Sequence, residues 1–364
     1  MYKLARGLLF RLDAELAHHL TLGVLTRFPA AAGLMAKPVP ESKRLQTTLH
    51  HLQFPHPIGL AAGLDKDGVA LHGLARCGFS FIEVGTVTPR PQPGNPTPRL
   101  FRLKEDEALI NRMGFNNRGA NELQRRLRDR PLRIPIGVNL GKNKDTPNAL
   151  AVDDYIHGVE MFAGLADYLV INVSSPNTPL LRDLQSEAEL IPLVQSVVAA
   201  RNKACQQRPT APPVLVKIAP DLSDDAIPTL AYALAEAGCQ GFIATNTTIT
   251  RNGLISEWKA ESGGLSGRPL RARSTDVIRL IHQSIEGRLP IIGSGGVFSA
   301  SDAYEKIKAG CTLVEIYTAF IYKGPALIAK MVEELDKLLA KDGFERMSDA
   351  VGSESNMEKK SGLR

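Results

Sequence analysis

The chain has 364 residues, about twice the length of a typical domain, so it forms either two domains or one large barrel. Hydrophobic residues make up 43% and charged residues 23%, values that exclude a disordered or a collagen-like chain. The net charge is +6, and residues 1–44 hold seven Lys and Arg against three acidic residues, so a basic front end precedes a nearly neutral body. No Cys or His pair has the spacing of a metal site, and no run of about 18 apolar residues predicts a membrane span.

Apolar residues recur at helical spacing near the start of the chain, at Leu4, Leu8, Leu12, Leu16, Leu20 and Val24. Asp13 is suited to cap a helix N-terminus, so we expect two short amphipathic helices that meet there. Arg11 and Asp13 interrupt the apolar stretch and no small-residue cleavage site follows, which disfavours a secretory signal. Two interpretations stay open: the pair lies on an anionic lipid surface, or it packs on its own domain.

Eight short, largely apolar runs alternate with amphipathic stretches in the body of the chain. We expect strands at 57–61, 81–87, 134–140, 168–173, 214–218, 241–245, 290–293 and 313–317. Helices are expected at 152–166, 187–204, 223–237, 299–309 and 325–339. Eight strand–helix units over about 250 residues predict an α/β fold, the (β/α)8 TIM barrel. A doubly wound open sheet is the alternative, but no GxGxxG motif follows an early strand.

Polar residues gather where the predicted strands end, which is where barrel enzymes carry their chemistry. These ends hold Asn, Ser, Thr and two lysines, with no His and, apart from Asp65, no carboxylate. A metal cage or a catalytic carboxylate pair is therefore disfavoured. Asparagine offers a donor and an acceptor to a planar ring of alternating NH and C=O groups. Lys217 stands inside an apolar run, where an unpaired charge is costly, and this favours a functional anionic partner.

Two turns predict a phosphate site. Gly-Ser-Gly-Gly at 293–296 follows the seventh strand, and Tyr317 and Thr318 follow the eighth, the usual phosphate position of such barrels. Glycines let backbone amides face a phosphate. The pattern therefore predicts a phosphorylated planar cofactor with a small polar anion beside it.

Long motifs in a fixed order then become recognisable. They include GLAAGLDKDG (59–68), INRMGFNN (110–117), INVSSPNTP (171–179), VKIAPDL (216–222), GGLSGRPL (263–270) and IYTAFIYKGP (316–325). Together they resemble the class 2, quinone-dependent dihydroorotate dehydrogenases of bacteria, from the start of the chain to about residue 340. The resemblance implies a TIM barrel with an N-terminal helical extension that oxidises (S)-dihydroorotate to orotate in pyrimidine (UMP) synthesis. It also implies FMN as cofactor and a membrane quinone as the final electron acceptor.

The resemblance also assigns residues. It places FMN against Ala61, Ala62, Gly63, Lys66, Thr86, Asn139, Asn172, Lys217, Thr245, Gly267, Gly295, Gly296, Tyr317 and Thr318. It places the substrate against Lys66, Asn111, Arg112, Met113, Gly114, Phe115, Asn172, Asn177, Asn246 and Thr247. Ser175 is implied as the catalytic base, with Thr178 or Ser174 passing its proton onward. His18, Arg102 and Tyr317 are implied as polar groups of a quinone tunnel, and no metal is expected.

We expect three regions: residues 1–44 as the helical pair, 45–344 as the FMN-binding barrel and 345–364 as a disordered tail. The protein is expected to be a monomer on the cytoplasmic face of a bacterial inner membrane, a peripheral protein without nucleic-acid partners. Leu180 departs from the resemblance, which has glycine there; if a positive φ is required, Leu180 strains the loop.

Two other functions remain as alternatives. One is a phosphosugar aldolase or isomerase in which Lys217 forms a Schiff base. The other is a membrane-attached binding module without catalysis.

Overall fold

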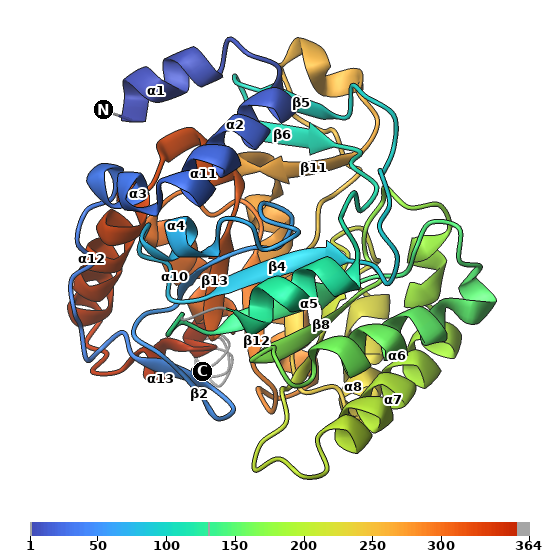
Figure 1. Ribbon diagram of the computed structural model, residues 1–364. Coiled ribbons are helices and arrows are strands. Elements are labelled where there is room, and N and C mark those ends of the chain that lie inside the picture. Colours follow the sequence, from blue (N-terminus) through green and yellow to red (C-terminus); the bar gives the residue numbers. More distant parts are fainter. Residues whose placement is uncertain (1, 130–131, 355–364) are drawn as a thin grey trace.

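The computed structural model describes residues 2–129 and 132–354, and its centre is a closed barrel of eight parallel strands (Figure 1). Around the barrel the strands run in the order β10, β12, β13, β3, β4, β7, β8, β9. Their bounds are β3 Ile58–Leu60, β4 Ile82–Val87, β7 Ile136–Leu140, β8 Tyr168–Asn172, β9 Val214–Ile218, β10 Phe242–Ala244, β12 Ile291–Ser294 and β13 Leu313–Ile316. All eight match predicted strands, so the TIM barrel is confirmed and the open sheet is wrong.

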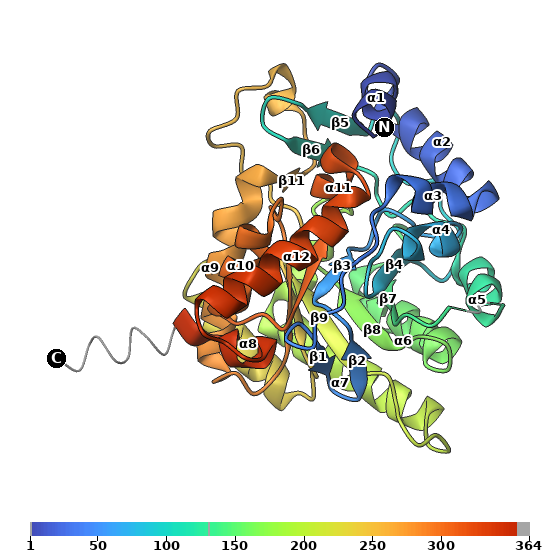
Figure 2. The same cartoon turned by 90° about the vertical axis from the view of Figure 1, so that its left-hand side faces the viewer.

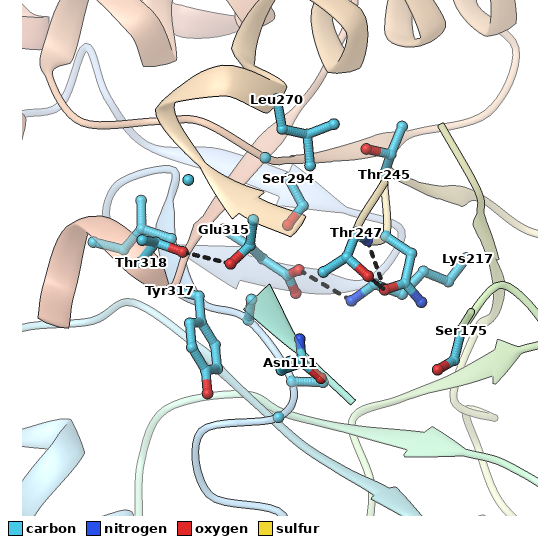
Figure 3. A pocket seen from close by; sticks show the side chains of 18 of the residues that line it. Asn111, Ser175, Lys217, Thr245, Thr247, Leu270, Ser294, Glu315, Tyr317 and Thr318 are labelled. Carbon is cyan, nitrogen blue, oxygen red and sulfur yellow. Dashed lines mark hydrogen bonds and ion pairs between the residues drawn. The ribbon is translucent and has the colours of Figure 1, made fainter. Parts of the chain in front are cut away.

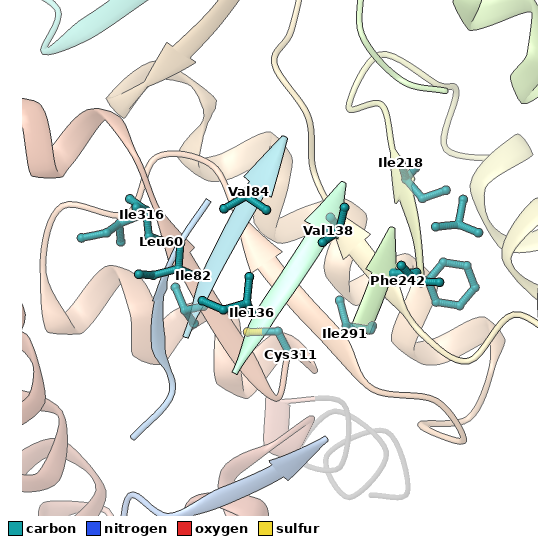
Figure 4. Close-up of a cluster of buried hydrophobic side chains, with 14 of the residues drawn as sticks. Leu60, Ile82, Val84, Ile136, Val138, Ile218, Phe242, Ile291, Cys311 and Ile316 are labelled. Carbon is teal, nitrogen blue, oxygen red and sulfur yellow. The ribbon is translucent and has the colours of Figure 1, made fainter. Parts of the chain in front are cut away.

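Helices surround the barrel and shield its strands from water (Figure 2). Their bounds are α4 Leu71–Ala75, α5 Ala120–Arg128, α6 Ala151–Phe162, α7 Glu187–Ala204, α8 Ala226–Glu236, α9 Arg271–Ser284, α10 Ala300–Ala309, α11 Thr318–Lys323 and α12 Ala326–Lys341. Buried aliphatic residues such as Val84 and Val138 fill the space between strands and helices (Figure 4). This layer explains why the strands read as continuous apolar runs.

The barrel interior is closed at the amino ends of the strands by a hairpin, β1 (Thr47–Leu49) and β2 (Leu52–Phe54). Its Leu49 and Phe54 join a buried apolar cluster with Phe81 and Tyr168. Gly137 makes room for this cluster, since a Cβ there would lie 2.1 Å from the Tyr168 ring. One end of the barrel is therefore a packed apolar plug, and chemistry is confined to the other end.

A small antiparallel sheet rises beside the open end of the barrel, formed by β5 (Leu100–Leu103), β6 (Ala108–Asn111) and β11 (Gly264–Gly267). It comes from insertions after β4 and β10. The N-terminal helices lie next to it in both views (Figures 1 and 2). The sheet thus joins the open end of the barrel to the front end of the chain.

The front end forms three helices: α1 (Tyr2–Leu9), α2 (Ala14–Arg27) and α3 (Pro29–Met35). Asp13 caps α2 by accepting from the amides of Glu15 and Leu16, as predicted, whereas α3 was not expected. One face packs on the barrel, where Leu25 and Ala32 are buried. The predicted leucine stripe points to solvent, with Leu4 79% and Leu8 67% exposed. Packing on the domain is therefore present for one face of these helices, and attachment of the other face to lipid stays a prediction.

The predicted disordered tail is wrong for its first part. α13 (Met347–Ala350) buries Met347 and Ala350, and the Met347 amide donates to the carbonyl of Arg44. Two apolar side chains in a polar segment were too weak a pattern to predict a helix. Residues 355–364 lie outside the described residues.

Candidate active site

A pocket opens at the carboxyl ends of the barrel strands and gathers all but two of the residues predicted to hold cofactor and substrate. Its lining includes Ala61, Ala62, Gly63, Lys66, Thr86, Asn111, Met113, Gly114, Phe115, Asn172, Ser175, Asn177, Lys217, Thr245, Asn246, Thr247, Gly267, Gly295, Gly296, Tyr317 and Thr318. Figure 3 shows side chains from several strands and loops pointing into one space. The polar residues at the strand ends therefore converge on one pocket, as expected from the sequence.

At one end of the pocket, a glycine turn packs closely against the backbone of a neighbouring segment. Gly295 and Gly296, after β12, have φ values of 114° and 71°, which favour glycine. A Cβ on Gly296 would lie 2.4 Å from the backbone of Arg271, so no other residue fits without movement. Thr318 stands beside this turn, and its hydroxyl is 2.9 Å from that of Ser266. This is the predicted phosphate end.

Amide side chains form a connected network at the middle of the pocket. Asn172 donates to the Thr86 hydroxyl at 2.9 Å and to Asn139 Oδ1 at 3.0 Å. Asn246 donates to Asn172 Oδ1 at 3.2 Å and to the Ser174 hydroxyl at 3.0 Å. Asn139 lies beneath the pocket and does not line it, because it is fully buried and donates to Glu83 at 2.9 Å. It supports the network from below.

Lys217 has two protein partners that the sequence did not reveal. Its Nζ lies 3.4 Å from Glu83 Oε1 and 3.9 Å from Glu315 Oε2, two carboxyls buried inside the barrel. Burial disfavours the lysine charge, but Glu83 and Glu315 outweigh it and raise the pKa of Lys217. The anionic partners of Lys217 in the structure are therefore two protein carboxyls, and the predicted functional anion stays a prediction. Both glutamates were missed, although each interrupts an apolar strand as Lys217 does.

The opposite end of the pocket carries the predicted substrate residues. Asn177 donates to Asn111 Oδ1 at 3.1 Å, and its backbone amide donates to the Ser175 hydroxyl at 3.2 Å. Arg112 does not line the pocket, because it pairs with Glu261 at 2.5 Å and stacks over Phe101. Of residues 111–115, the structure thus brings four to the pocket and turns Arg112 away.

Lys66 lies in the pocket wall near charged groups of the N-terminal region. Burial lowers the pKa of Lys66 to about 8, and Asp67 and Glu15 partly oppose this shift. Lys66 is therefore a cation whose charge is easily lost when no anion is beside it.

The loop that carries Ser175 is held by contacts that the sequence did not reveal. Arg182 donates to the carbonyl of Ser174 at 3.0 Å and to that of Thr247 at 2.9 Å, so it ties two sides of the pocket together. Leu180 has a φ of 55°, which confirms the predicted strain. The buried hydroxyl of Thr178 has no hydrogen-bond partner among the described residues.

A second, largely apolar pocket lies between the N-terminal helices and the barrel. Phe10, Ala17, Leu22 and Phe320 contribute to its wall. The three predicted tunnel residues, His18, Arg102 and Tyr317, all line it. Tyr317 also lines the first pocket, so a single side chain borders both.

The polar groups of the apolar pocket are restrained. Arg102 donates to the carbonyl of Leu9 at 3.0 Å and to that of Leu12, which fixes the join between α1 and α2. Desolvation lowers the pKa of His18 to about 3, so this ring is neutral at physiological pH.

Over residues 2–129 and 132–354, no group of side chains could hold a metal ion, and no helix is long and apolar enough to cross a bilayer.

The fold and these pockets define a TIM-barrel enzyme whose site lies at the carboxyl ends of the strands and is bordered by an apolar cavity. A sequence model described as dihydroorotate dehydrogenase matches residues 44–339. The chain belongs to the dihydroorotate dehydrogenase family.

Its relatives agree with this assignment over nearly the whole chain. The dihydroorotate dehydrogenase (quinone) of Deinococcus deserti is 48% identical over 358 residues, which cover 95% of this chain and 98% of the relative. That of Myxococcus xanthus is 47% identical over 365 residues, with 97% and 98% covered. The crystal structure of DHODH from Eimeria tenella in complex with ferulenol superposes with a TM-score of 0.87 at 40% identity, covering 94% of this chain and 95% of that one.

Proposed function

We propose that this protein oxidises (S)-dihydroorotate to orotate, with FMN as the hydride acceptor and a membrane quinone as the final electron acceptor, in pyrimidine synthesis. The observation that carries the proposal is the pair of pockets that share Tyr317. One is polar and suits a planar cofactor with its substrate, and the other is apolar and suits a quinone ring and tail.

The residues of the polar pocket fit FMN. Thr245 Oγ1 and Asn177 Oδ1 are buried there and have no partner in the described part of the chain, so a ligand with a polar ring edge would satisfy them. Gly295 and Gly296 have positive φ values that favour glycine, and a glycine turn of this kind lets backbone amides face a phosphate. Lys217 supplies a positive charge to the same pocket. Bound FMN supplies a hydride acceptor.

The protein side of the reaction follows from the substrate's chemistry. Dihydroorotate loses a proton from C5 and a hydride from C6, and its carboxylate requires a cation, the role proposed for Lys66. Asn111, Asn177 and Asn246 hold the ring edge and fix its orientation. Ser175 takes the C5 proton.

A serine hydroxyl is a weak base and needs an acceptor for its own proton. Ser174 is already engaged, since its hydroxyl lies 3.2 Å from Asn172 Oδ1 and accepts from Asn246. Thr178 has an unpartnered buried hydroxyl, and this supports Thr178 as the relay.

The Schiff-base alternative is disfavoured by the surroundings of Lys217. A lysine must be neutral to attack a carbonyl, and the buried Glu83 beside Lys217 favours its charged form. A binding module without catalysis is disfavoured by membership of an enzyme family.

The visible spectrum and one anaerobic mixing experiment test the proposed activity. The purified protein is expected to be yellow, and dihydroorotate added without oxygen should bleach the flavin band. Sodium borohydride with a phosphosugar should trap nothing on Lys217. A folded protein that stays colourless after incubation with FMN would contradict the proposal, as would a flavin that dihydroorotate does not bleach.

The N-terminal helices support a peripheral attachment to the cytoplasmic face of a bacterial membrane. Leu4 and Leu8 project into solvent, and the exposed Lys3 on the same helix and Arg11 just after it can meet anionic headgroups. Inserting two leucines that are 79% and 67% exposed is worth roughly 2–4 kcal/mol. Each 1.4 kcal/mol is about tenfold, so the pair contributes about two orders of magnitude in partitioning.

Vesicle co-sedimentation tests this attachment. Leu4→Ser with Leu8→Ser should weaken binding to anionic vesicles about 100-fold. High salt should weaken binding of the unmodified protein. Leu150→Ser, which changes a 54% exposed leucine before α6, is the matched control and should have no effect. Equal loss in both variants, or binding indifferent to salt, would contradict the attachment.

A further inference from the structure

Three ionisable side chains meet inside the barrel between the apolar plug and the polar pocket. Glu83 comes from β4, Lys217 from β9 and Glu315 from β13. Both glutamate side chains are 0% exposed and that of Lys217 is 7% exposed. Figure 3 shows Lys217 and Glu315 facing each other at the pocket floor. One cation thus serves two buried carboxyls; we call these three side chains the charge cluster.

The two carboxyls of the charge cluster are unequally supplied with donors. Glu83 Oε1 accepts from Asn139 at 2.9 Å and from Lys217 at 3.4 Å, and Tyr168 points its hydroxyl at Glu83 Oε2 from 3.5 Å. Neither oxygen of Glu315 accepts a hydrogen bond from any described residue, and its nearest cation is Lys217 at 3.9 Å. The donors are arranged for one carboxylate, and that carboxylate is Glu83.

Within residues 2–129 and 132–354, no other charge is placed to stabilise a second anion. The groups that face Glu315 are Glu83, Lys217 and Tyr168, and burial keeps the Tyr168 phenol neutral by raising its pKa well above the usual value. Below them lies the plug of Phe81, Leu215 and Leu313. An ionised carboxylate without donors in such a place is strongly disfavoured. Burial and the nearby Glu83 accordingly raise the pKa of Glu315 well above its ordinary value, against the opposing charge of Lys217.

We propose that Glu315 keeps its proton at neutral pH and shares it with Glu83, so that the charge cluster has no net charge. This inference rests on the proposed function only in its consequence for the flavin. Lys217 lines the cofactor pocket, and the charge that it presents there is offset by one carboxylate and not by two. Glu83 and Glu315 are therefore positioning residues that set the electrostatic potential at the flavin.

A shared proton makes the two single glutamine variants behave alike. When Glu315→Gln removes the protonated member, Glu83 remains ionised beside Lys217. When Glu83→Gln removes the ionised member, Glu315 gives up its proton and takes over the charge. Only the double variant leaves Lys217 without a carboxylate, so only the double variant gains a positive charge.

Potentiometric titration of bound flavin at pH 7 tests this pattern. Glu315→Gln and Glu83→Gln should each leave the flavin potential close to that of the unmodified holoenzyme, and the double variant should raise it clearly. If both carboxyls were ionised, each single variant would raise the potential by one step and the double variant by two. A rise in Glu315→Gln comparable to the step between single and double variants would overturn the proposal.

Infrared spectroscopy of the unmodified protein gives a second measurement. It depends neither on the folding of a variant nor on catalytic turnover. Glutamate labelled with ¹³C identifies the C=O band of a protonated carboxyl group, which should be present at pH 7. That band should disappear in Glu315→Gln if the variant folds. Its absence from the unmodified protein at pH 7 would overturn the proposal. The infrared result does not depend on dihydroorotate or quinone, so failure of the proposed function and failure of this inference are distinguishable.

Discussion

Replacing Lys217 with methionine removes the only cation of the charge cluster and leaves its volume nearly unchanged. Because the side chains of Glu83 and Glu315 are fully buried, the remaining negative charge has no counter-ion. Removing one partner of a buried ion pair costs about 3–5 kcal/mol. We therefore expect Lys217→Met to lower the free energy of unfolding by about this amount at neutral pH, in addition to changing the flavin environment.

The loss should depend on pH in a definite direction. Without Lys217, burial favours a proton on the remaining carboxylate, so its pKa in the folded protein lies above the unfolded value. Such a group costs no stability at a pH below its pKa in the unfolded chain. It lowers the free energy of unfolding as the pH rises toward its pKa in the folded protein. One proton is involved, so the free energy of unfolding should fall by about 1.4 kcal/mol per pH unit above about pH 4.5 until the full loss is reached.

Urea unfolding with saturating FMN between pH 5 and pH 8, followed by circular dichroism, measures this loss. The triple variant Lys217→Met, Glu83→Gln, Glu315→Gln is the matched control, because it removes the charges together and should recover most of the lost stability. A Lys217→Met protein that is equally destabilised at pH 5 and pH 8 would refute the reasoning. A protein within about 1 kcal/mol of the unmodified one at pH 8 would refute it as well.

Two further predictions concern the polar pocket. Ser175→Ala should slow flavin reduction by dihydroorotate roughly 10²–10⁴-fold in stopped-flow measurements, whereas Ser175→Cys should keep part of the rate; an unaffected alanine variant would remove Ser175 from its role. Burial lowers the pKa of Lys66 to about 8, so the unliganded protein loses this charge as the pH rises. The Kd for orotate, read from the flavin spectrum, should therefore rise by up to about tenfold per pH unit above that value, and a constant Kd from pH 6.5 to pH 9.5 would contradict the carboxylate role of Lys66.

The barrel could be predicted because its strands are buried on both faces. β4 and β9, for example, consist almost entirely of buried residues, so each leaves a continuous apolar run in the sequence. The resemblance of the long motifs to a known family placed most pocket residues, and the barrel then brings these motifs together at its strand ends.

The partners of Lys217 could not be predicted from such runs. Glu83, Glu315 and Lys217 are each a single charged residue in a separate strand, and only the closure and register of the barrel bring them together. The direction of Arg112 likewise depends on Glu261, which is far away in sequence. The helix α13 is held by two apolar side chains that are buried in the fold. The local sequence pattern does not predict this tertiary contact.

In the proposed function, the pockets on the two sides of Tyr317 serve separate half-reactions. Thr21 is exposed and lines the apolar pocket, so Thr21→Trp should narrow its mouth. Thr26→Trp is a matched control on the same helix. Both threonine hydroxyls donate at 2.8 Å to the carbonyl four residues earlier, and Thr26 does not line the pocket.

Stopped-flow measurements test this separation most directly. They follow flavin reduction by dihydroorotate in one experiment and flavin reoxidation by a long-tailed quinone in another. In Thr21→Trp, reduction should keep its rate while reoxidation slows at least tenfold, and Thr26→Trp should match the unmodified protein in both steps. Full-rate reoxidation in Thr21→Trp, or equal slowing of both half-reactions, would contradict the account.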